Sequence, residues 1–415
     1  MTREIITFGC RLNAYESEVI KGALEKAQLE NVMVFNTCAV TKEAERQAMQ
    51  AIRKARRNFP DKKIIVTGCA AQINPSKYAA MTEVDQVLGN QEKLESHNYL
   101  SIATDEKVKV NDIMSVKDTA MHMISSFHGQ ARAFIQIQNG CNHRCTFCSI
   151  PFGRGNSRSV AIGEIVEQVK VLVDGDYKEV VLTGVDITDY GLDLPGKPTL
   201  GQMIRRLLNL VPDLPRLRLS SIDVAEIDET LMDLIVNEPR LMPHLHISLQ
   251  SGDNMILKRM KRRHTREEVI EFCKLTRAKR PDIAFGADII AGFPTETDEM
   301  FENTLKLIKE AGIQYTHIFT YSERDDTPAA RMPQVDLSMR KKRAKLLREA
   351  GQKELDKFVE INLNRTHQVI VEQNNYGHTE NFLKFQFDQN LKPGSLVTAK
   401  ITGYNDNILT ATIVG

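Results

Sequence analysis

The sequence predicts an α/β protein that ends in a small all-β unit. Short apolar runs alternate with helix-like stretches as far as about residue 322, which is typical of parallel sheets covered by helices. From residue 366 the pattern changes to short β-rich runs separated by turn signals. We therefore expect an N-terminal parallel α/β sheet domain over residues 1–125, a central partial (β/α)6 barrel over 126–355 and a small all-β OB-like barrel over 356–415.

The predicted N-terminal domain contains three strands, each followed by a cysteine. The strands are EIITF, VMVFNT and KIIVTG, with helices expected over residues 17–29 and 43–57, and the cysteines are Cys10, Cys38 and Cys69. Because the carboxyl ends of parallel strands meet at one edge of a sheet, these thiols are expected to converge as ligands of one site. The alternative is three unrelated buried cysteines, since cysteine is often buried.

The central part contains six candidate strands separated by helix-like segments. The strands are AFIQIQ, EVVLTG, LRLSSI, HLHISLQSG, FGADIIAG and YTHIFTY, and helices are expected to begin near residues 162, 199, 227, 265 and 297. A further charged helix is expected over residues 336–356. Active sites of such barrels lie at the carboxyl ends of the strands, so the loops that follow these runs are the candidates for chemistry.

The C-terminal unit contains the runs HQVIVE, FLKFQF, SLVTAKI and ILTATIV, with turns expected at residues 374–377 and 392–394. OB-like barrels bind single-stranded nucleic acid through basic grooves and stacking. Arg365, Lys384, Lys392 and Lys400 are candidate phosphate contacts, and ordinary surface charge is the alternative for each.

Composition limits the possible compartments and partners. The net charge of +1 carries no global signature of nucleic-acid binding, so any such contact must be local. No stretch approaches the roughly 20 apolar residues that span a bilayer, and the N-terminus lacks a signal-peptide core, so no membrane association and a cytoplasmic location are expected. In that compartment seven cysteines favour metal or redox chemistry over disulfides. Cys273, at helical spacing among apolar residues, is expected to be a core thiol.

The strongest motif is CNHRCTFC, a CX3CX2C run formed by Cys141, Cys145 and Cys148 after the first barrel strand. Three thiolates would leave one iron of a four-iron cluster without a protein ligand, and such an open position permits chemistry. A structural zinc site is the alternative, although His143 inside the motif is the only nearby fourth ligand.

With Phe147 at its aromatic position, this run resembles the signature of the radical S-adenosylmethionine (SAM) superfamily. The resemblance implies that Cys141, Cys145 and Cys148 are the catalytic cysteines and hold a 4Fe-4S cluster. It also implies that SAM binds the open iron and is cleaved to a 5′-deoxyadenosyl radical by an electron from an external donor such as flavodoxin or ferredoxin. The cofactor supplies that chemistry, and the protein supplies position and electrostatics.

The segments TFGCRLNAYESE, NTCAV and VTGCAAQ resemble the N-terminal domain of methylthiotransferases within this superfamily. That resemblance implies a second 4Fe-4S cluster on Cys10, Cys38 and Cys69. The barrel segments TGVDITDYG, SSID, HISLQSG and MKRRHT resemble SAM-contacting segments, and the C-terminal unit resembles the RNA-binding TRAM domain. The SAM contacts implied, together with Phe147, are Gly184, Val185, Ser221, Gln250 and Arg262.

The residues around the first cysteine indicate a branch of the family. Arg11-Leu12-Asn13 and Tyr15-Glu16-Ser17-Glu18 resemble the branch that acts on N6-threonylcarbamoyladenosine at position 37, in the anticodon stem-loop of tRNA. The same chemistry on isopentenyl-adenosine tRNA, or on a ribosomal-protein aspartate, is an alternative. A non-enzymatic RNA-binding metal sensor is a more remote one.

Overall fold

The chain divides into two compact units in a computed structural model that describes residues 3–100, 106–117, 119, 124, 131–405 and 408–414. The first unit takes its described residues from 1–124, 138–160 and 322–330, and the second from 125–137, 161–321 and 331–415. The CX3CX2C loop therefore belongs to the same compact unit as the N-terminal sheet. The three predicted domain boundaries stay a prediction.

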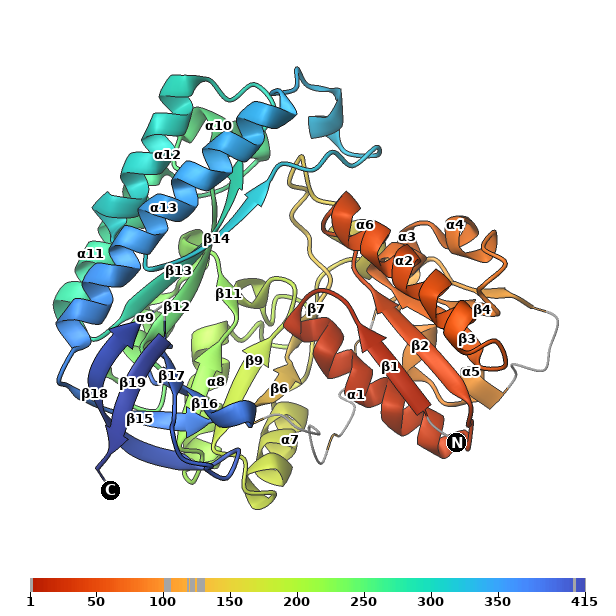
Figure 1. Ribbon diagram of the computed structural model, residues 1–415, viewed down its shortest axis with the longest axis horizontal. Coiled ribbons are helices and arrows are strands. Elements are labelled where there is room, and N and C mark those ends of the chain that lie inside the picture. The colour runs from red at the N-terminus through yellow and green to blue at the C-terminus, as the bar shows by residue number, and fades with distance from the viewer. Residues whose placement is uncertain are drawn as a thin grey trace. The chain divides into compact units, whose positions relative to one another are not determined.

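The first unit is built on a parallel sheet in the order β1-β2-β3-β4-β5 (Figure 1). The three predicted strands are present as β1, β2 and β3, whereas β4 and β5 were missed because they contribute only three and two residues. The bounds are β1 (Arg3–Thr7), β2 (Val32–Thr37), β3 (Lys63–Gly68), β4 (Gln86–Leu88) and β5 (Val108–Lys109).

Helices cover both faces of this sheet and create two apolar layers (Figure 1). One layer joins α1 to Val32, Val34 and Ile65, and the other joins α2, α3 and α4 to Phe35 and Val66. Alternate strand residues point to opposite faces, which explains why β2 is buried along its whole length. The helices are α1 (Arg11–Lys26), α2 (Lys42–Asn58), α3 (Cys69–Ile73), α4 (Pro75–Ala79) and α5 (His97–Leu100).

The predicted first helix was placed too late in the chain. The apolar spacing favoured a start at Ser17, but α1 begins at Arg11, directly after Cys10 as its N-cap. The first turns of α1 are polar and nevertheless buried, because Asn13, Glu16 and Ser17 bond to groups inside the first unit. A pattern that looks for apolar faces passes over such residues.

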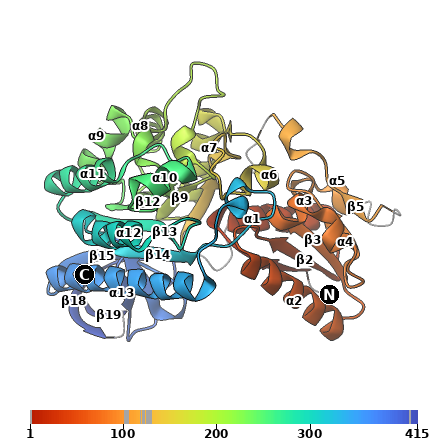
Figure 2. The same ribbon diagram turned by 90° about the horizontal axis from the view of Figure 1, so that it is seen from above.

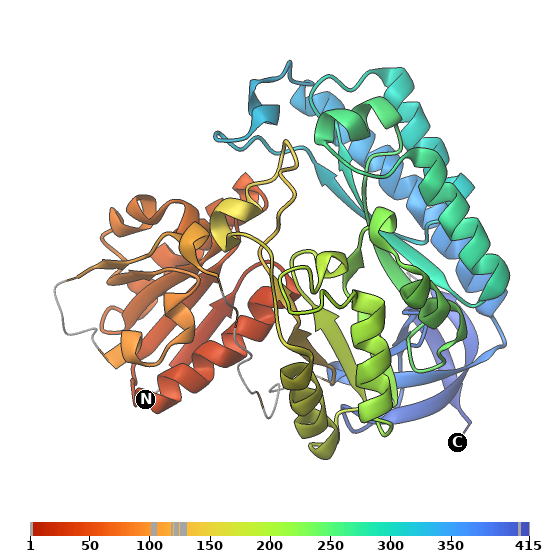
Figure 3. The same ribbon diagram turned by 180° about the vertical axis from the view of Figure 1, so that it is seen from behind.

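The second unit contains the predicted partial barrel, divided between two parallel sheets (Figures 1 and 3). One sheet has the order β10-β9-β6 and the other β11-β12-β13-β14. The predicted strand LRLSSI is interrupted at Ser220, so β10 pairs with β9 and β11 pairs with β12. The bounds are β6 (Ala133–Gln136), β9 (Glu179–Thr183), β10 (Arg216–Leu219), β11 (Ser221–Ile222), β12 (His244–Gln250), β13 (Ala284–Ala291) and β14 (Tyr315–Thr320).

Helices follow these strands and pack outside them (Figure 2). Two begin with capping boxes, in which Thr199 and Thr265 exchange hydrogen bonds with Gln202 and Glu268. The helix expected near Ile227 begins at Glu229, with Asp228 as its N-cap. The bounds are α7 (Ile162–Asp174), α8 (Leu200–Leu210), α9 (Glu229–Asn237), α10 (Asn254–Met260), α11 (Arg266–Lys279), α12 (Asp298–Ala311) and α13 (Leu337–Asn362).

The C-terminal strands, which belong to the second unit, form a closed barrel in the order β15-β16-β17-β19-β18. This confirms the predicted small β-barrel. The expected turn at residues 374–377 was partly wrong, because Tyr376 and Gly377 begin β16, which pairs with β15 and β17. The bounds are β15 (Thr366–Val371), β16 (Tyr376–Thr379), β17 (Lys384–Gln386), β18 (Leu396–Asn405) and β19 (Ile408–Ile413).

Three further expectations concern single residues or the whole chain. Cys273 is completely buried in α11, as predicted for a core thiol. Arg365, Lys384, Lys392 and Lys400 are all exposed. Within the described ranges, no helix is both long enough and apolar enough to cross a bilayer.

Candidate functional site

Cys10, Cys38 and Cys69 follow the carboxyl ends of β1, β2 and β3, which are neighbours in the sheet. Cys10 is exposed, whereas Cys38 and Cys69 are buried, and all three are free thiols. Gly9 lies against Cys38, because a Cβ atom on Gly9 would come within 2.8 Å of the Cys38 Sγ. The positive φ of Gly9, +95°, and its missing side chain thus allow the first two cysteine turns to approach each other.

The chemistry of this set suits a metal cluster with an incomplete ligand shell. The structure brings three thiols to one sheet edge, as the sequence predicted, and thiolates are the usual ligands of iron–sulfur clusters. Burial raises the pKa of the Cys38 thiol to about 11. That thiol is therefore protonated at neutral pH, and cluster binding would release its proton.

The second cysteine triad lies in a loop between β7 (Gln138–Asn139) and the short helix α6 (Ile150–Arg154). Cys141, Cys145 and Cys148 are each half-buried, as is Phe147. The Cys141 backbone N–H donates to the Gly155 carbonyl at 3.1 Å, and the Cys148 N–H donates to the Cys145 carbonyl at 3.1 Å. These bonds fold the loop back on itself.

Helix α6 packs this loop against the Cys69 turn of the same unit. A Cβ atom on Gly153 would lie 3.2 Å from the Cys69 Cβ, so the two backbones are in close contact. Asn90 donates through its amide to the Gly153 carbonyl and faces the Cys69 Sγ at 3.8 Å. The chain segments that carry the two triads therefore touch through Gly153 and Cys69.

A buried polar network joins the same two segments. The Arg154 guanidinium donates to both oxygens of Glu16, at 2.7 and 2.9 Å, and to the Asn13 side-chain oxygen at 2.6 Å. The Lys93 ammonium also donates to the Oε2 of Glu16, at 2.7 Å. Arg154, Glu16 and Lys93 are almost completely excluded from solvent. A network so buried is stable only when each member keeps its partners.

The network reaches the turns of Cys10 and Cys38 through their backbone, and the third turn through the Cys69 thiol. The Asn13 amide donates to the carbonyls of Phe8 and Thr37, which precede Cys10 and Cys38. Lys93 donates to the Asn90 side-chain oxygen at 2.7 Å, and Asn90 faces Cys69. One connected set of side chains thus supports all three turns.

The charged groups of this network keep both Glu16 and Arg154 ionised. Burial opposes the ionisation of Glu16, but Arg154 and Lys93 outweigh it and lower the pKa of that carboxyl to about 2. Burial also opposes the charge of Arg154, yet its pKa is raised above the usual value by Cys69, Glu16 and Cys10. Arg154 is therefore a permanent positive charge beside two of the cysteines.

The remaining predicted cofactor contacts lie in the second unit. Gly184 and Val185 follow β9, Ser221 begins β11, and Gln250 ends β12 with a positive φ of +69°. All are half-buried positions at or just beyond strand ends, apart from Ser221 at a strand start. Strand-end loops of this kind are where partial barrels bind their ligands.

Arg262, the last predicted contact, follows α10 and forms an ion pair with an acidic residue. Its Nη2 donates to the Asp223 carboxylate and to the Ser248 carbonyl, both at 2.7 Å. His264 contacts the other Asp223 oxygen at 3.1 Å. Burial opposes ionisation of Asp223, but His264 and Arg262 lower its pKa to about 2. Asp223 therefore positions Arg262.

Sequence reasoning missed the residues that support the cysteines and Arg262. Glu16, Lys93 and Arg154 are charged residues in polar stretches, and their separations of up to 138 positions give no local pattern. The one usable signal was that Asn13 and Glu16 fall on one face of the helix that begins directly after Cys10. Asp223 and His264 stood within recognised segments, but their pairing was not apparent.

Family models match two parts of the chain. Residues 135–308 match the radical SAM superfamily, and residues 2–89 match a family described as the uncharacterized protein family UPF0004. The first match spans the CX3CX2C loop and most of the two barrel sheets. The second spans Cys10, Cys38 and Cys69.

Two curated relatives match the whole chain or most of it. The threonylcarbamoyladenosine tRNA methylthiotransferase MtaB of Rickettsia prowazekii is 60% identical over 414 residues, which cover 100% of this chain and 98% of the relative. The tRNA-2-methylthio-N(6)-dimethylallyladenosine synthase of Staphylococcus aureus is 32% identical over 83% of this chain and 70% of that protein.

A solved structure shares the fold at low sequence identity. The radical S-adenosylmethionine methyltransferase TsrM of Kitasatospora setae, with cobalamin and a [4Fe-4S] cluster bound, superposes with a TM-score of 0.58. The match covers 79% of this chain and 76% of that one at 15% identity. At this identity the likeness concerns the fold alone.

Proposed function

The chain belongs to the radical SAM methylthiotransferases, and we propose that it places a methylthio group on C2 of N6-threonylcarbamoyladenosine at position 37 of tRNA. It is a transferase. One observation carries the choice of substrate: 60% identity over the whole chain to a threonylcarbamoyladenosine tRNA methylthiotransferase. The isopentenyl-type alternative is less supported, since a relative acting on dimethylallyladenosine is only 32% identical.

Two cofactor sites follow from this assignment. Cys141, Cys145 and Cys148 would hold the 4Fe-4S cluster that binds SAM, and Cys10, Cys38 and Cys69 would hold a second 4Fe-4S cluster. When bound, the first cluster and SAM supply the radical that activates C2, and the second cluster supplies sulfur. The donor sets fit, because each consists of three cysteine thiols in one loop or at one sheet edge, and none of them forms a disulfide.

The protein's own contribution is to position these groups. The backbone at Gly184 and Val185 would contact the SAM amino group, and Ser221, Gln250 and Phe147 would line the rest of its site. Arg262, which Asp223 already orients, would face the SAM carboxylate with its planar donors. Arg154 and Glu16 would keep the two cysteine-bearing segments in a constant arrangement.

The partners follow from the substrate and the chemistry. The RNA is the anticodon stem-loop, and the closed C-terminal barrel, with its exposed Arg365, Lys384, Lys392 and Lys400, is the candidate platform for it. SAM cleavage needs an electron, so an external donor such as flavodoxin or ferredoxin is required. We place the enzyme in the cytoplasm, where tRNA is modified.

Product analysis tests this proposal. Cluster-loaded enzyme, SAM and a reductant would be incubated without oxygen with tRNA that carries N6-threonylcarbamoyladenosine, and the nucleosides would be analysed by mass spectrometry. We expect that nucleoside to gain one methylthio group. Parallel incubations would contain isopentenyl-adenosine tRNA and a ribosomal protein. Methylthiolation of either of these, with the first substrate unchanged, would show that the substrate assignment is wrong.

Metal analysis separates the enzyme from a metal sensor. Two 4Fe-4S clusters require about eight iron and eight sulfide per chain. Zinc on the cysteines without any sulfide would eliminate the radical mechanism.

A further inference from the structure

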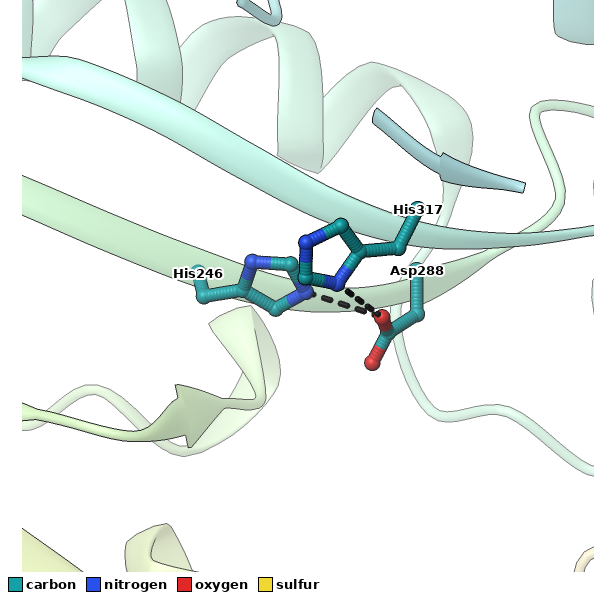
Figure 4. A group of neighbouring side chains, drawn as sticks. All are labelled: His246, Asp288 and His317. Carbon is teal, nitrogen blue, oxygen red and sulfur yellow. Dashed lines mark hydrogen bonds and ion pairs between the residues drawn. The ribbon is translucent and has the colours of Figure 1, made fainter. Parts of the chain in front are cut away.

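Three side chains on neighbouring strands of the second unit form a cluster to which the proposed function assigns no role. They are His246 on β12, Asp288 on β13 and His317 on β14 (Figure 4). The strands are adjacent and parallel, with His317 paired to Asp288 and His246 paired to Gly286. Because side chains alternate along a strand, residues 286 and 288 share a face, so all three side chains point the same way.

Both imidazole rings are directed at one carboxylate oxygen. The His246 Nε2 lies 2.9 Å and the His317 Nδ1 lies 3.3 Å from the Asp288 Oδ1. The two rings are 4.6 Å apart between centroids and tilted by 38°. Figure 4 shows the two rings next to each other, with their nitrogens turned to the same oxygen.

Gly286, beside the cluster, leaves room for the His246 ring. A Cβ atom on Gly286 would lie only 2.5 Å from the His246 Nδ1, so a larger residue there would displace the ring. The His246 side chain is 9% exposed and Asp288 25%, whereas His317 is 60% exposed. The cluster is thus buried on one side and open to solvent on the other.

The geometry matches a coordination shell. Two imidazole nitrogens and one carboxylate oxygen lie within 4.8 Å of one another. For metal bonds of about 2.0–2.1 Å, neighbouring ligand atoms are about 2.9–3.4 Å apart, depending on the coordination geometry. The two nitrogen–oxygen separations of 2.9 and 3.3 Å fall in that range. Two histidines and one carboxylate are a common ligand set for zinc and for ferrous iron.

We propose that His246, Asp288 and His317 bind one divalent transition-metal ion of the zinc or ferrous class. This ion is additional to the two clusters, because its ligands come from the second unit and include no cysteine. Three protein ligands leave at least one position open, and the exposed His317 side places that position toward solvent. Water or an oxygen atom of a bound ligand would occupy it. The inference does not depend on the identity of the tRNA substrate.

Zinc uptake by the full-length, cluster-loaded protein tests this site. Clusters occupy the six ligand cysteines, so the remaining zinc sites can be measured by anaerobic equilibrium dialysis against Zn²⁺ with metal analysis. We would compare the wild type with His246→Gln and His317→Gln. His97→Gln is the matched control, because His97 is an exposed histidine paired with Glu95 in the first unit. Iron and sulfide content and circular dichroism would establish that each variant is folded and loaded.

The wild type and His97→Gln should each bind about one zinc per chain. Both site variants should bind it at least about tenfold more weakly, and His317→Gln is informative even if His246→Gln is unstable, because His317 is mostly exposed. Zinc X-ray absorption should show nitrogen and oxygen neighbours at about 2.0–2.2 Å and no sulfur at about 2.3 Å. No uptake by the wild type, equal uptake by His317→Gln, or sulfur neighbours would overturn the proposal.

Discussion

Arg154 and Glu16 form a two-point ion pair that is almost completely excluded from solvent, with Nη1–Oε1 and Nη2–Oε2 distances of 2.7 and 2.9 Å. Glu16 lies six residues after the first N-terminal cysteine, and Arg154 lies six residues after the last cysteine of the CX3CX2C loop. This pair links the loop of one cysteine triad to the helix that starts at the other.

Removing Arg154 should strongly destabilise the first unit. Arg154→Met leaves the Glu16 carboxylate buried with only Lys93 as a charged partner, and breaking a buried pair in this way costs about 3–5 kcal/mol. Urea unfolding measured by circular dichroism would test this. Arg46→Met is the control, because Arg46 makes a similar two-point contact with Glu43 on the surface. Equal unfolding midpoints for the two variants would contradict a structural role of the buried pair.

The pH dependence of stability should reveal the ionised state of Glu16. Its pKa is lowered from 4.5 to about 2 in the folded chain, so ionised Glu16 stabilises the fold above pH 4.5. That contribution, about 3 kcal/mol for a shift of this size, is lost as the pH falls from 4.5 toward 2. The stability difference between wild type and Glu16→Gln should therefore be constant from pH 7 to 5 and shrink below 4.5. A difference that is unchanged at pH 3 would refute the assignment.

Gly9→Ala should prevent assembly at the N-terminal triad. The added Cβ would lie 2.8 Å from both the Cβ and the Sγ of Cys38, at a φ of +95° that side chains disfavour. If both proposed clusters form in the wild type, iron and sulfide should fall from about eight to about four per chain, because only the CX3CX2C cluster would remain. Gly22→Ala in α1 is the control, since a Cβ there has no neighbour within 4 Å. Full iron content in Gly9→Ala would show that the added Cβ atom does not prevent cluster assembly at the N-terminal triad.

The two triads should differ in what their loss abolishes. Cys145→Ser removes a proposed ligand of the cluster that would bind SAM, so reductive SAM cleavage should disappear. Cys38→Ser removes a proposed ligand of the second cluster, which would supply sulfur, so some cleavage should remain without methylthio product. Chromatography of 5′-deoxyadenosine, together with nucleoside mass spectrometry, measures both. Normal product yield from Cys38→Ser would show that this division of roles is wrong.

Periodicity predicted most of the fold because strands and helices with one apolar face repeat at characteristic intervals. It located β1, β2 and β3, the barrel strands and the change to a small β-barrel. Periodicity failed where the buried residues are polar and where the strands are short. The start of α1 was missed because Asn13 and Glu16 are buried through hydrogen bonds, and β4 and β5 are too short to show a period.

The sequence by itself determined which six cysteines are candidate ligands, since motif spacing and a position just after a strand are local properties of the chain. Only the tertiary structure revealed that Arg154, Glu16, Lys93 and Asn13 form one buried network beneath the N-terminal triad. It alone brought His246, Asp288 and His317 to one face of a sheet. The physical reason is that strand register and the burial of charge depend on contacts between residues far apart in the chain, and such contacts leave no period in the sequence.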